Sequence, residues 1–552
     1  MDIKGILKSL TEDIESISDE KVKSVQKTLL NLIEALVSEN NELREENQRL
    51  RDENNRLKGE QGKPGFRKQT QASQNISSEK ERRKGQPKKK KKNKRDKRNS
   101  IKVNRIETLE IDQSQLPPDA EFKGYKSVFV QDIIITTDNI EFKKAVYYSP
   151  SLNKNFMATL PEGYQGEFGP FVKALIMDLH KNSTQPAIVN FLNTHGVMIS
   201  PATVSRFITD DNEHFHQEKM DIVQAGLPST TWQQMDDTGA RVNGKNYYTH
   251  ILCNPFYTAY FTRQHKMRMT ILEILTQGEM MFYFNESAYS FMKQMNLPDK
   301  TMALLKQHNP KQVMNRKEVD ALLMELFPNK NKKLTNRQII LEASAIIAYR
   351  ELPYAIQLLL TDDAPQYNQI VENLALCWIH DGRHYKKLTP VVPSHIKEQK
   401  YFLDTYWAYY HKLLAYKESR KPEVAAQLLV EFDSIFSTIT SYDQLNERIE
   451  KTKNNKDSLL LVLQHPELPL HNNTSELGAR RQARYRDISL QTKNMKGTEA
   501  KDTHMTITET AKKLCVNSFR YFYDRISGKY EMPSLASLIK LKSNDYQRLA
   551  PA

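Results

Sequence analysis

Two pairs of adjacent aspartates follow apolar, strand-like stretches, where carboxylates can hold divalent metal ions. Asp236 and Asp237 come late in the stretch TTWQQMDDTGARV, and Asp362 and Asp363 end the apolar run AIQLLLTDDAPQY. A fifth acid, Glu476, opens a helical stretch far downstream. Hard oxygen ligands suit Mg²⁺ or Mn²⁺, and two such ions roughly 4 Å apart would activate the attacking oxygen and stabilise the leaving one in an in-line displacement. Carboxylates of this kind are compatible with metal-dependent phosphoryl transfer.

The elements that would position these acids form an α/β pattern. Residues 230–263 read as three antiparallel strands separated by turns at NGK and NP, a helical stretch follows from about 267 to 350, and a buried strand ends at Asp362. Two strand-borne aspartates and a helix-borne glutamate predict a ribonuclease-H-like core with helical insertions. An aspartate after a strand is more often a turn former or helix cap, so the spacing alone does not select these acids.

Residues 22–58 show the heptad repeat of a coiled coil. Leucines occupy the d positions and mainly asparagines occupy the a positions, namely Leu29, Leu36, Leu43, Leu50 and Leu57 at d, with Ile33, Asn40, Asn47 and Asn54 at a. Asparagine at a favours a parallel two-stranded pairing. Glutamates at g precede basic residues at e by five positions, which makes the g–e′ pairs of a homodimer attractive (Glu39, Glu46 and Glu53 with Arg44, Arg51 and Lys58). The alternative is a solitary amphipathic helix.

A basic tether follows the heptads. Residues 59–100 are poor in apolar residues and end in a run that includes Lys88, Lys89, Lys90, Lys91 and Lys92, which accounts for most of the net charge of +14. Such a composition cannot form a core, so we expect a disordered segment that binds DNA phosphates without sequence preference. A solvated linker that binds nothing is the alternative.

Two small modules are predicted before the core. Residues 101–165 contain strand-like stretches between turn formers, which predicts a small β-rich module. Residues 166–228 have the grammar of a helix-turn-helix, in which Thr203, Ser205 and Arg206 would face DNA. A purely structural helical hairpin has the same spacing.

The three cysteines of the chain narrow the function classes. They form no CxxC pair, which excludes a disulfide framework and an all-cysteine zinc ribbon. The N-terminus has no signal-peptide pattern and no long apolar stretch occurs, so we expect a cytoplasmic protein with no membrane contact.

Residues 160–545 resemble the insertion-sequence 66 (IS66) family of transposases, which are of the DDE type. The resemblance is carried, in order, by GEFGPFVKALI with SPATVSRF, MDDTGARVNGKNYYTHI, TDDAPQYNQI with CWIHDGRHYKKL, and HNNTSELGARRQARYRDIS. It implies that Asp236, Asp362 and Glu476 are the catalytic, metal-binding residues. Asp237 matches a neighbouring acid and Asp363 replaces a glycine, so each aspartate pair leaves the choice of ligand open by one residue.

The resemblance also places supporting residues beside the acids. Cys377 and His380 match an element next to the active site, and core packing explains them better than zinc, because one Cys and one His supply half a tetrahedral set. Arg383, Arg480 and Arg481 would contact DNA phosphates or lie on a solvated helical face. Many relatives carry a cysteine zinc finger before the helix-turn-helix, whereas residues 101–165 contain no cysteine, so no zinc is expected there.

The expected function is transposition of a mobile element, in which the protein binds the element's ends and target DNA and uses two Mg²⁺ or Mn²⁺ ions. Accessory proteins of the same element are possible partners. The alternatives are a non-catalytic DNA-binding descendant and a metal-dependent nuclease or resolvase. The expected domains are a coiled coil at 1–58, a tether at 59–100, a β-rich module at 101–165, a helix-turn-helix at 166–228, a catalytic domain at 229–500 with an insertion at 267–350, and a helical segment at 501–552.

Overall fold

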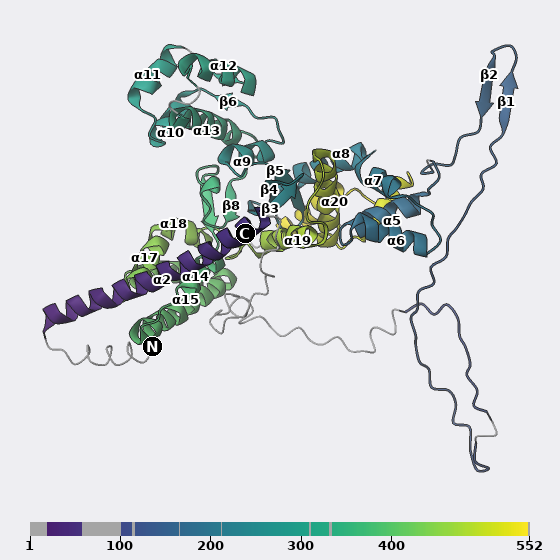
Figure 1. The fold of residues 1–552 in the computed structure, drawn as a ribbon, viewed down its shortest axis with the longest axis horizontal. Helices are drawn as coiled ribbons and strands as arrows, with labels where there is room; N and C mark the ends of the chain where they lie inside the picture. The colour runs from purple at the N-terminus through teal and green to yellow at the C-terminus, as the bar shows by residue number, and fades with distance from the viewer. Residues whose placement is uncertain are drawn as a thin grey trace.

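The structure is a computed structural model that describes residues 19–57, 101–112, 116–164, 166–210, 212–308, 311–329 and 334–549. The predicted basic tether, including Lys88 to Lys92, lies outside the described residues. A five-stranded sheet lies at the centre, with helical lobes around it and a long extended arm to one side (Figure 1).

The central sheet has the strand order β5-β4-β3-β8-β9. Its strands are β3 (Trp232–Val242), β4 (Lys245–Cys253), β5 (Thr258–Arg263), β8 (Leu358–Thr361) and β9 (Asn373–Leu376). The first three are antiparallel, as predicted, whereas β8 and β9 run parallel to β3. Asn243 and Gly244 both have positive φ (46° and 76°), the backbone of the tight two-residue turns that suit the twist of a hairpin.

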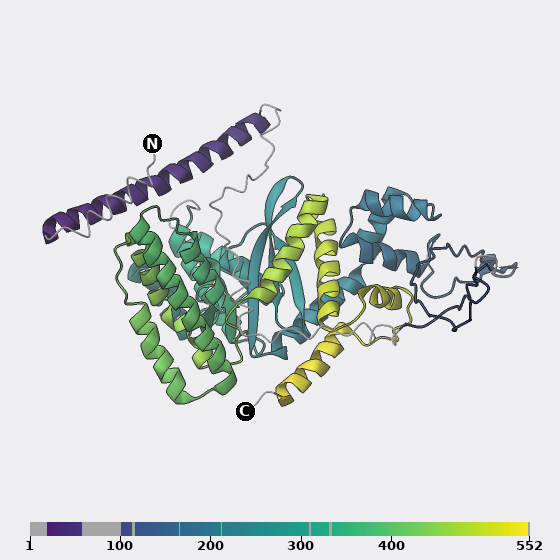
Figure 2. The same cartoon turned by 90° about the horizontal axis from the view of Figure 1, so that it is seen from below.

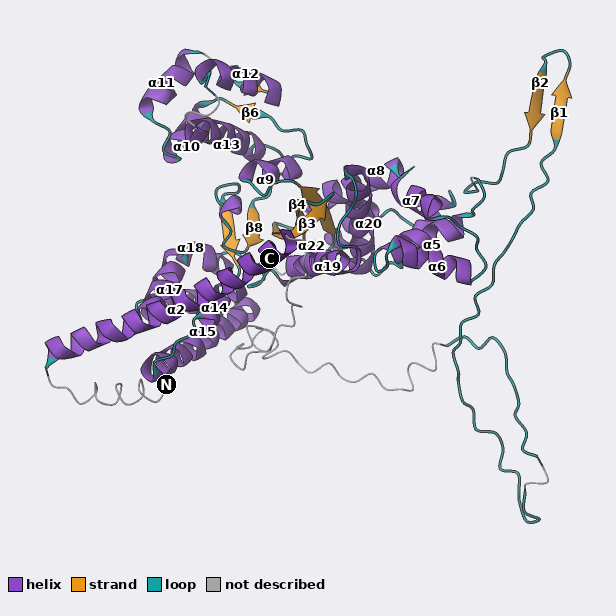
Figure 3. Cartoon of the chain, in the orientation of Figure 1, coloured by secondary structure: helices purple, strands orange, loops and turns teal. Residues whose placement is uncertain are grey.

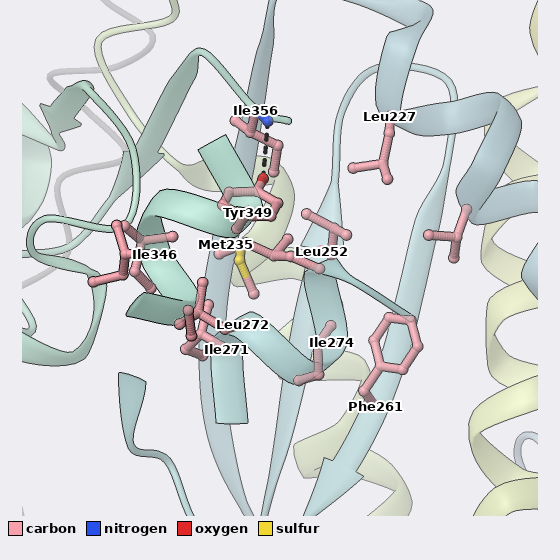
Figure 4. Packing of buried hydrophobic residues seen from close by; sticks show 14 of the residues in the cluster. Leu227, Met235, Leu252, Phe261, Ile271, Leu272, Ile274, Ile346, Tyr349 and Ile356 are labelled. Atoms are coloured by element: carbon pink, nitrogen blue, oxygen red, sulfur yellow. Dashed lines mark hydrogen bonds between the residues drawn. The ribbon is translucent and has the colours of Figure 1, made fainter. Parts of the chain in front are cut away.

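Helices cover both faces of this sheet, and most residues of its strands are therefore buried. On one face, Met235 and Leu252 pack against α9 (Arg268–Leu275) and α13 (Leu334–Arg350) (Figure 4). On the other face, Ile251 and Tyr260 pack against α19 (Asn473–Ser489) and α20 (Met495–Lys513). Figure 2 shows the strands between the green helical lobe and the yellow-green helices.

One helical insertion interrupts the sheet, and a second separates its last strand from α19. The first lies between β5 and β8, where residues 267–350 were predicted to be helical, and contains α9, α10 (Glu286–Gln294), α11 (Asp299–Gln307), α12 (Arg316–Leu326), α13 and the pair β6 (Phe282–Tyr283) and β7 (Val313–Met314). The second follows β9 and contains α14 (Trp378–Lys387), α15 (Pro393–Ser419), α16 (Pro422–Ile435), α17 (Asp443–Asn454) and α18 (Lys456–Leu459). The second has its own aromatic core, in which Trp378 packs against Tyr406 and Tyr409.

The N-terminal part contains one long helix, an arm and a helical module. The helix α2 (Glu20–Leu57) covers the predicted heptads. The module consists of α5 (Pro170–His180), α6 (Gln185–Thr194) and α7 (Pro201–Thr209), which share a small core. Ser200 caps α7 by accepting a hydrogen bond from the Thr203 backbone N–H.

Three predicted boundaries need correction. The described part of residues 101–165 forms one hairpin, β1 (Val146–Ser149) with β2 (Lys154–Met157), and is otherwise loop (Figure 3), because the predicted strands find no partner strand within the described chain. The boundary at 228 separates α8 (Glu213–Gly226) from the core into which it packs. The boundary at 500 cuts α20, and α20, α21 (Ser518–Ile526) and α22 (Leu535–Leu549) also join that core.

None of the helices in the described ranges combines the length with the apolar character that crossing a membrane requires.

The hydroxyl of Tyr349 fixes the entry into β8, because it accepts a hydrogen bond from the buried Ile356 N–H at 2.8 Å (Figure 4). Tyr349→Phe should lower the free energy of unfolding by about 1–3 kcal/mol, since it leaves that N–H buried and unpaired. Urea unfolding measures the change, with the more exposed Tyr354→Phe as control. Equal stability of the two variants would contradict this role.

His504 makes the fold sensitive to acid. Its ring lies edge-on to Phe215 and Phe522, both ring nitrogens are buried without partners, and burial, followed by the neighbouring histidines, lowers its pKa to about 3. Below pH 6.5 the unfolded chain binds a proton at this position that the folded chain does not bind, so stability falls as the pH falls.

Between pH 6.5 and 5, the wild type should therefore lose about 2 kcal/mol more unfolding free energy than His504→Leu loses. Urea unfolding at the two pH values gives this difference. The exposed His265→Leu serves as control and should follow the wild type. A parallel pH dependence in His504→Leu and the wild type would rule out this source of acid sensitivity.

Candidate active site

Asp236 on β3 and Asp362, directly after the end of β8, lie at the same edge of the sheet, and these two neighbouring strands are parallel. Gln234 of β3 is in register with Leu360 of β8, so each aspartate comes two residues beyond a paired position. Side chains alternate along a strand, and Asp236 is paired with Ile251, whose side chain packs under α19. Asp236 therefore lies on the sheet face that α19 covers.

The two carboxylates repel one another in a partly buried setting. Burial and then the charge of Asp362 raise the pKa of Asp236 to about 7, and the charges of Asp237 and Glu476 also raise it. Burial and the charge of Asp237 raise the pKa of Asp362. The Oδ1 atom of Asp362 is buried without a hydrogen-bond partner. This edge of the sheet consequently favours a positive charge that would bring the acids together.

Glu476 reaches the same face from the first turn of α19. The helix is tied to β3 because the Ser475 N–H donates a hydrogen bond to the Gln234 side chain (3.3 Å). It lies close to the sheet at Gly478, where a Cβ would come 2.8 Å from Ile251. A side chain at Gly478 would push α19 and its glutamate away from the strands.

Basic side chains hold the Glu476 carboxylate. Arg383 donates from Nη2 to Oε2 at 3.2 Å, Arg480 lies 3.6 Å from the same oxygen, and His380 Nε2 lies 3.7 Å from Oε1. His380 and Arg383 come from α14, so the helix that begins the second insertion supplies these partners. The predicted supporting residue His380 and the predicted DNA-binding residues Arg383 and Arg480 therefore meet at the predicted catalytic glutamate.

Asp237 and Asp363, the alternative ligands in each aspartate pair, are bonded to other side chains. Asp237 lies on the opposite sheet face, where Gln366 donates to its Oδ2 at 2.7 Å and Lys266 Nζ lies 3.8 Å from its Oδ1. Asp363 is exposed and accepts a hydrogen bond from Asn455 at 3.1 Å. Both carboxylates are thus engaged by polar side chains of neighbouring segments.

Lys266 is a residue that the sequence analysis missed. It lies in the loop between β5 and α9, and its ammonium group lowers the pKa of Asp362. No motif surrounds it in the sequence, and only the return of β5 to this edge of the sheet brings it near the acids. It supplies a half-exposed positive charge beside the acidic pair.

The oxygen donors fit a hard divalent cation in type. Asp236 and Asp362 offer carboxylates, one with an unpartnered buried oxygen, as Mg²⁺ or Mn²⁺ prefers. Within the described ranges, however, no three His, Cys, Asp or Glu side chains are gathered closely enough to hold a metal ion. The Glu476 carboxylate is paired with Arg383 and Arg480 and is not gathered with the two aspartates.

The side chains of Cys377 and Arg481 are bonded to other parts of the chain. Cys377 precedes α14, its Sγ accepts a hydrogen bond from the Asn472 N–H at 3.4 Å, and burial raises the pKa of its thiol to about 12. Arg481 was predicted to contact DNA, but its guanidinium is bonded to Asn182 (2.7 Å) and paired with Glu509 (3.3 Å). Arg481 thus joins α19 to neighbouring helices, and its contact with DNA stays a prediction.

The predicted DNA-facing residues Thr203, Ser205 and Arg206 lie on α7. Arg206 is exposed and Ser205 is half-buried. Thr203 is also half-buried, and its hydroxyl lies 3.0 Å from that of Ser200. Arg206 is therefore the residue of the three whose side chain is most open to a partner.

Part of this chain is similar in sequence to known proteins. Residues 351–500, which include Asp362, α14 and Glu476, match the family described as Transposase IS66 family. The chain is also 29% identical over 328 residues to the uncharacterized protein y4jO of Sinorhizobium fredii, across 58% of this chain and 100% of that protein. No solved structure matches. Residues 351–500 of this chain thus carry a sequence match to the IS66 transposase family.

Proposed function

We propose that this protein is a DDE transposase that cuts DNA at the ends of a mobile element and joins them to a target. The observation that carries the proposal is the approach of Asp236 to Asp362 at one sheet edge, under the helix α19, whose first turn contains Glu476. The mixed sheet with helices on both faces supports a ribonuclease-H-like core. The segment that matches the IS66 transposase family contains two of the three acids, Asp362 and Glu476.

Within each aspartate pair, the geometry favours one member. Asp236 shares its sheet face with α19 and feels the charges of both Asp362 and Glu476. Asp237 points to the other face, toward Lys266 and Gln366. Asp363 is exposed and bonded to Asn455. Asp236, Asp362 and Glu476 are therefore the proposed catalytic set.

Mg²⁺ or Mn²⁺ would be held by these three carboxylates and, when bound, would activate the attacking oxygen and stabilise the leaving one. Glu476 would exchange its contact with Arg383 for the cation. Arg383, released from Glu476, would then be able to bind a DNA phosphate. Lys266 would supply a second positive charge near the same phosphate. The proposed route for DNA to this edge involves α7, whose exposed Arg206 suits a phosphate or base edge.

Removal of each proposed carboxylate should abolish strand cleavage and joining. Asp236→Asn, Asp362→Asn and Glu476→Gln should each lower the rate on element-end DNA in Mg²⁺ or Mn²⁺ by a factor of about 1,000 or more, since each loses a ligand charge. Binding of the same DNA, measured by gel shift in EDTA, should stay within about two-fold, because DNA binding is assigned to other segments.

The neighbouring acids provide matched controls. Asp237→Asn and Asp363→Asn change the same charge one residue away and should keep most of the cleavage activity. An inactive Asp237→Asn beside an active Asp236→Asn would move the assignment by one residue. Strand transfer by Glu476→Gln at the wild-type rate would contradict the catalytic proposal.

Lys266→Met should slow cleavage by about 10- to 1,000-fold, because it removes a positive charge beside the reacting phosphate. Single-turnover cleavage of end DNA measures the rate. Lys245→Met removes an exposed lysine at the start of β4 and should leave the rate unchanged. If the two variants are equally active, Lys266 has no part in the reaction.

A further inference from the structure

The first half of α2 packs on the second helical insertion. Leu30 and Glu34 are only 6% and 4% exposed, and Leu30 contacts Val392 at the start of α15. Beyond residue 38, every described side chain of α2 is exposed. Figures 1 and 2 show α2 beside the green helices of this insertion. The helix therefore has a docked half and a free half.

A buried carboxylate anchors the docked half. Glu34 accepts hydrogen bonds from the backbone N–H groups of Val391 (2.8 Å) and Val392 (2.8 Å), and His395 Nδ1 lies 3.3 Å from Oε1. These groups belong to the N-terminus of α15, where backbone N–H groups lack helical partners and the helix dipole favours an anion. A buried carboxylate is tolerated when such donors satisfy it.

A second contact of the same kind lies three residues earlier. The Asn31 side chain donates to the Ser441 carbonyl and accepts from the Asp443 N–H, each at 3.0 Å. Asp443 is the first residue of α17. α2 thus meets the N-termini of two insertion helices with two polar side chains, which fixes both its position and its rotation.

The leucine face of α2 is left open by this docking. The d-position leucines are more than half exposed, with values of 52% for Leu29, 55% for Leu36, 51% for Leu43 and 59% for Leu50. Glu34 and Asn31 occupy other positions of the heptad, so the anchor and the seam use different sides of the helix. Ile33 belongs to the docked surface and also occupies an a position of the seam.

We propose that Glu34 and Asn31 clamp α2 to its own chain's second insertion while the leucine face pairs with the same face of a second copy. The occupant is a second copy because the exposed leucines, the asparagines at a and the opposite charges at g and e match their own symmetry mate in a parallel pair. The coiled coil would then hold two catalytic lobes at a fixed distance. This inference does not rest on the catalytic proposal.

Light scattering and amide hydrogen exchange on the full chain test the two surfaces separately. The wild type should have the mass of a dimer and slow exchange in a peptide that contains Val391 and Val392. Glu34→Ala should remain a dimer but exchange there at least ten-fold faster, and Glu34→Gln, which keeps an acceptor oxygen, should exchange less rapidly than Glu34→Ala. Glu42→Ala changes an exposed glutamate on the free half and should match the wild type.

The paired variant Leu43→Lys/Leu50→Lys separates a clamp within one chain from a clamp between chains. It should have the mass of a monomer and keep the slow exchange at Val391 and Val392. Fast exchange in this monomer would show that the partner supplies the clamp and would overturn the proposal. A monomeric wild type, a monomeric Glu34→Ala, or unchanged exchange in Glu34→Ala would also overturn it. None of these measurements depends on DNA cleavage.

Discussion

Repulsion between carboxylates at one edge of the sheet is the constraint on which the arrangement of this protein depends. The register between β3 and β8 brings Asp236 beside Asp362, and their partial burial raises the pKa of both. Such an assembly of like charges is unfavourable unless cations compensate it. The surrounding basic groups come from distant segments, namely the loop before α9 and the helix α14, so both insertions begin beside the acids.

The sequence predicted the parts of the site that local patterns encode. The strand pattern around Asp236, the apolar run before Asp362 and the helical start at Glu476 each correspond to an observed element. The choice between adjacent aspartates depends on side-chain alternation relative to α19, which is a property of the sheet's register. Lys266 and the internal role of Arg481 depend on tertiary contacts between segments far apart in the chain.

The parts of the fold that repeat along the chain were also predictable, whereas contacts between distant segments were not. Heptads and apolar periodicity indicated α2 and the meander, because their stabilising contacts repeat along the chain. The stretch around Ile133 and Ile134 has strand composition, yet both side chains are 83% exposed, since a strand needs a partner that composition does not specify. The docking of α2 on α15 was also not visible, because Glu34 looks like any surface glutamate of a coiled coil until its backbone partners are known.

The central claim is that Asp236, Asp362 and Glu476 form one metal-binding site. Anomalous diffraction from crystals soaked in Mn²⁺ tests it most directly. The account predicts anomalous density between Asp236 and Asp362, with the Glu476 carboxylate turned from Arg383 toward the ion. Mn²⁺ bound elsewhere in the chain, with these three carboxylates free of it at saturating concentration, would contradict the account.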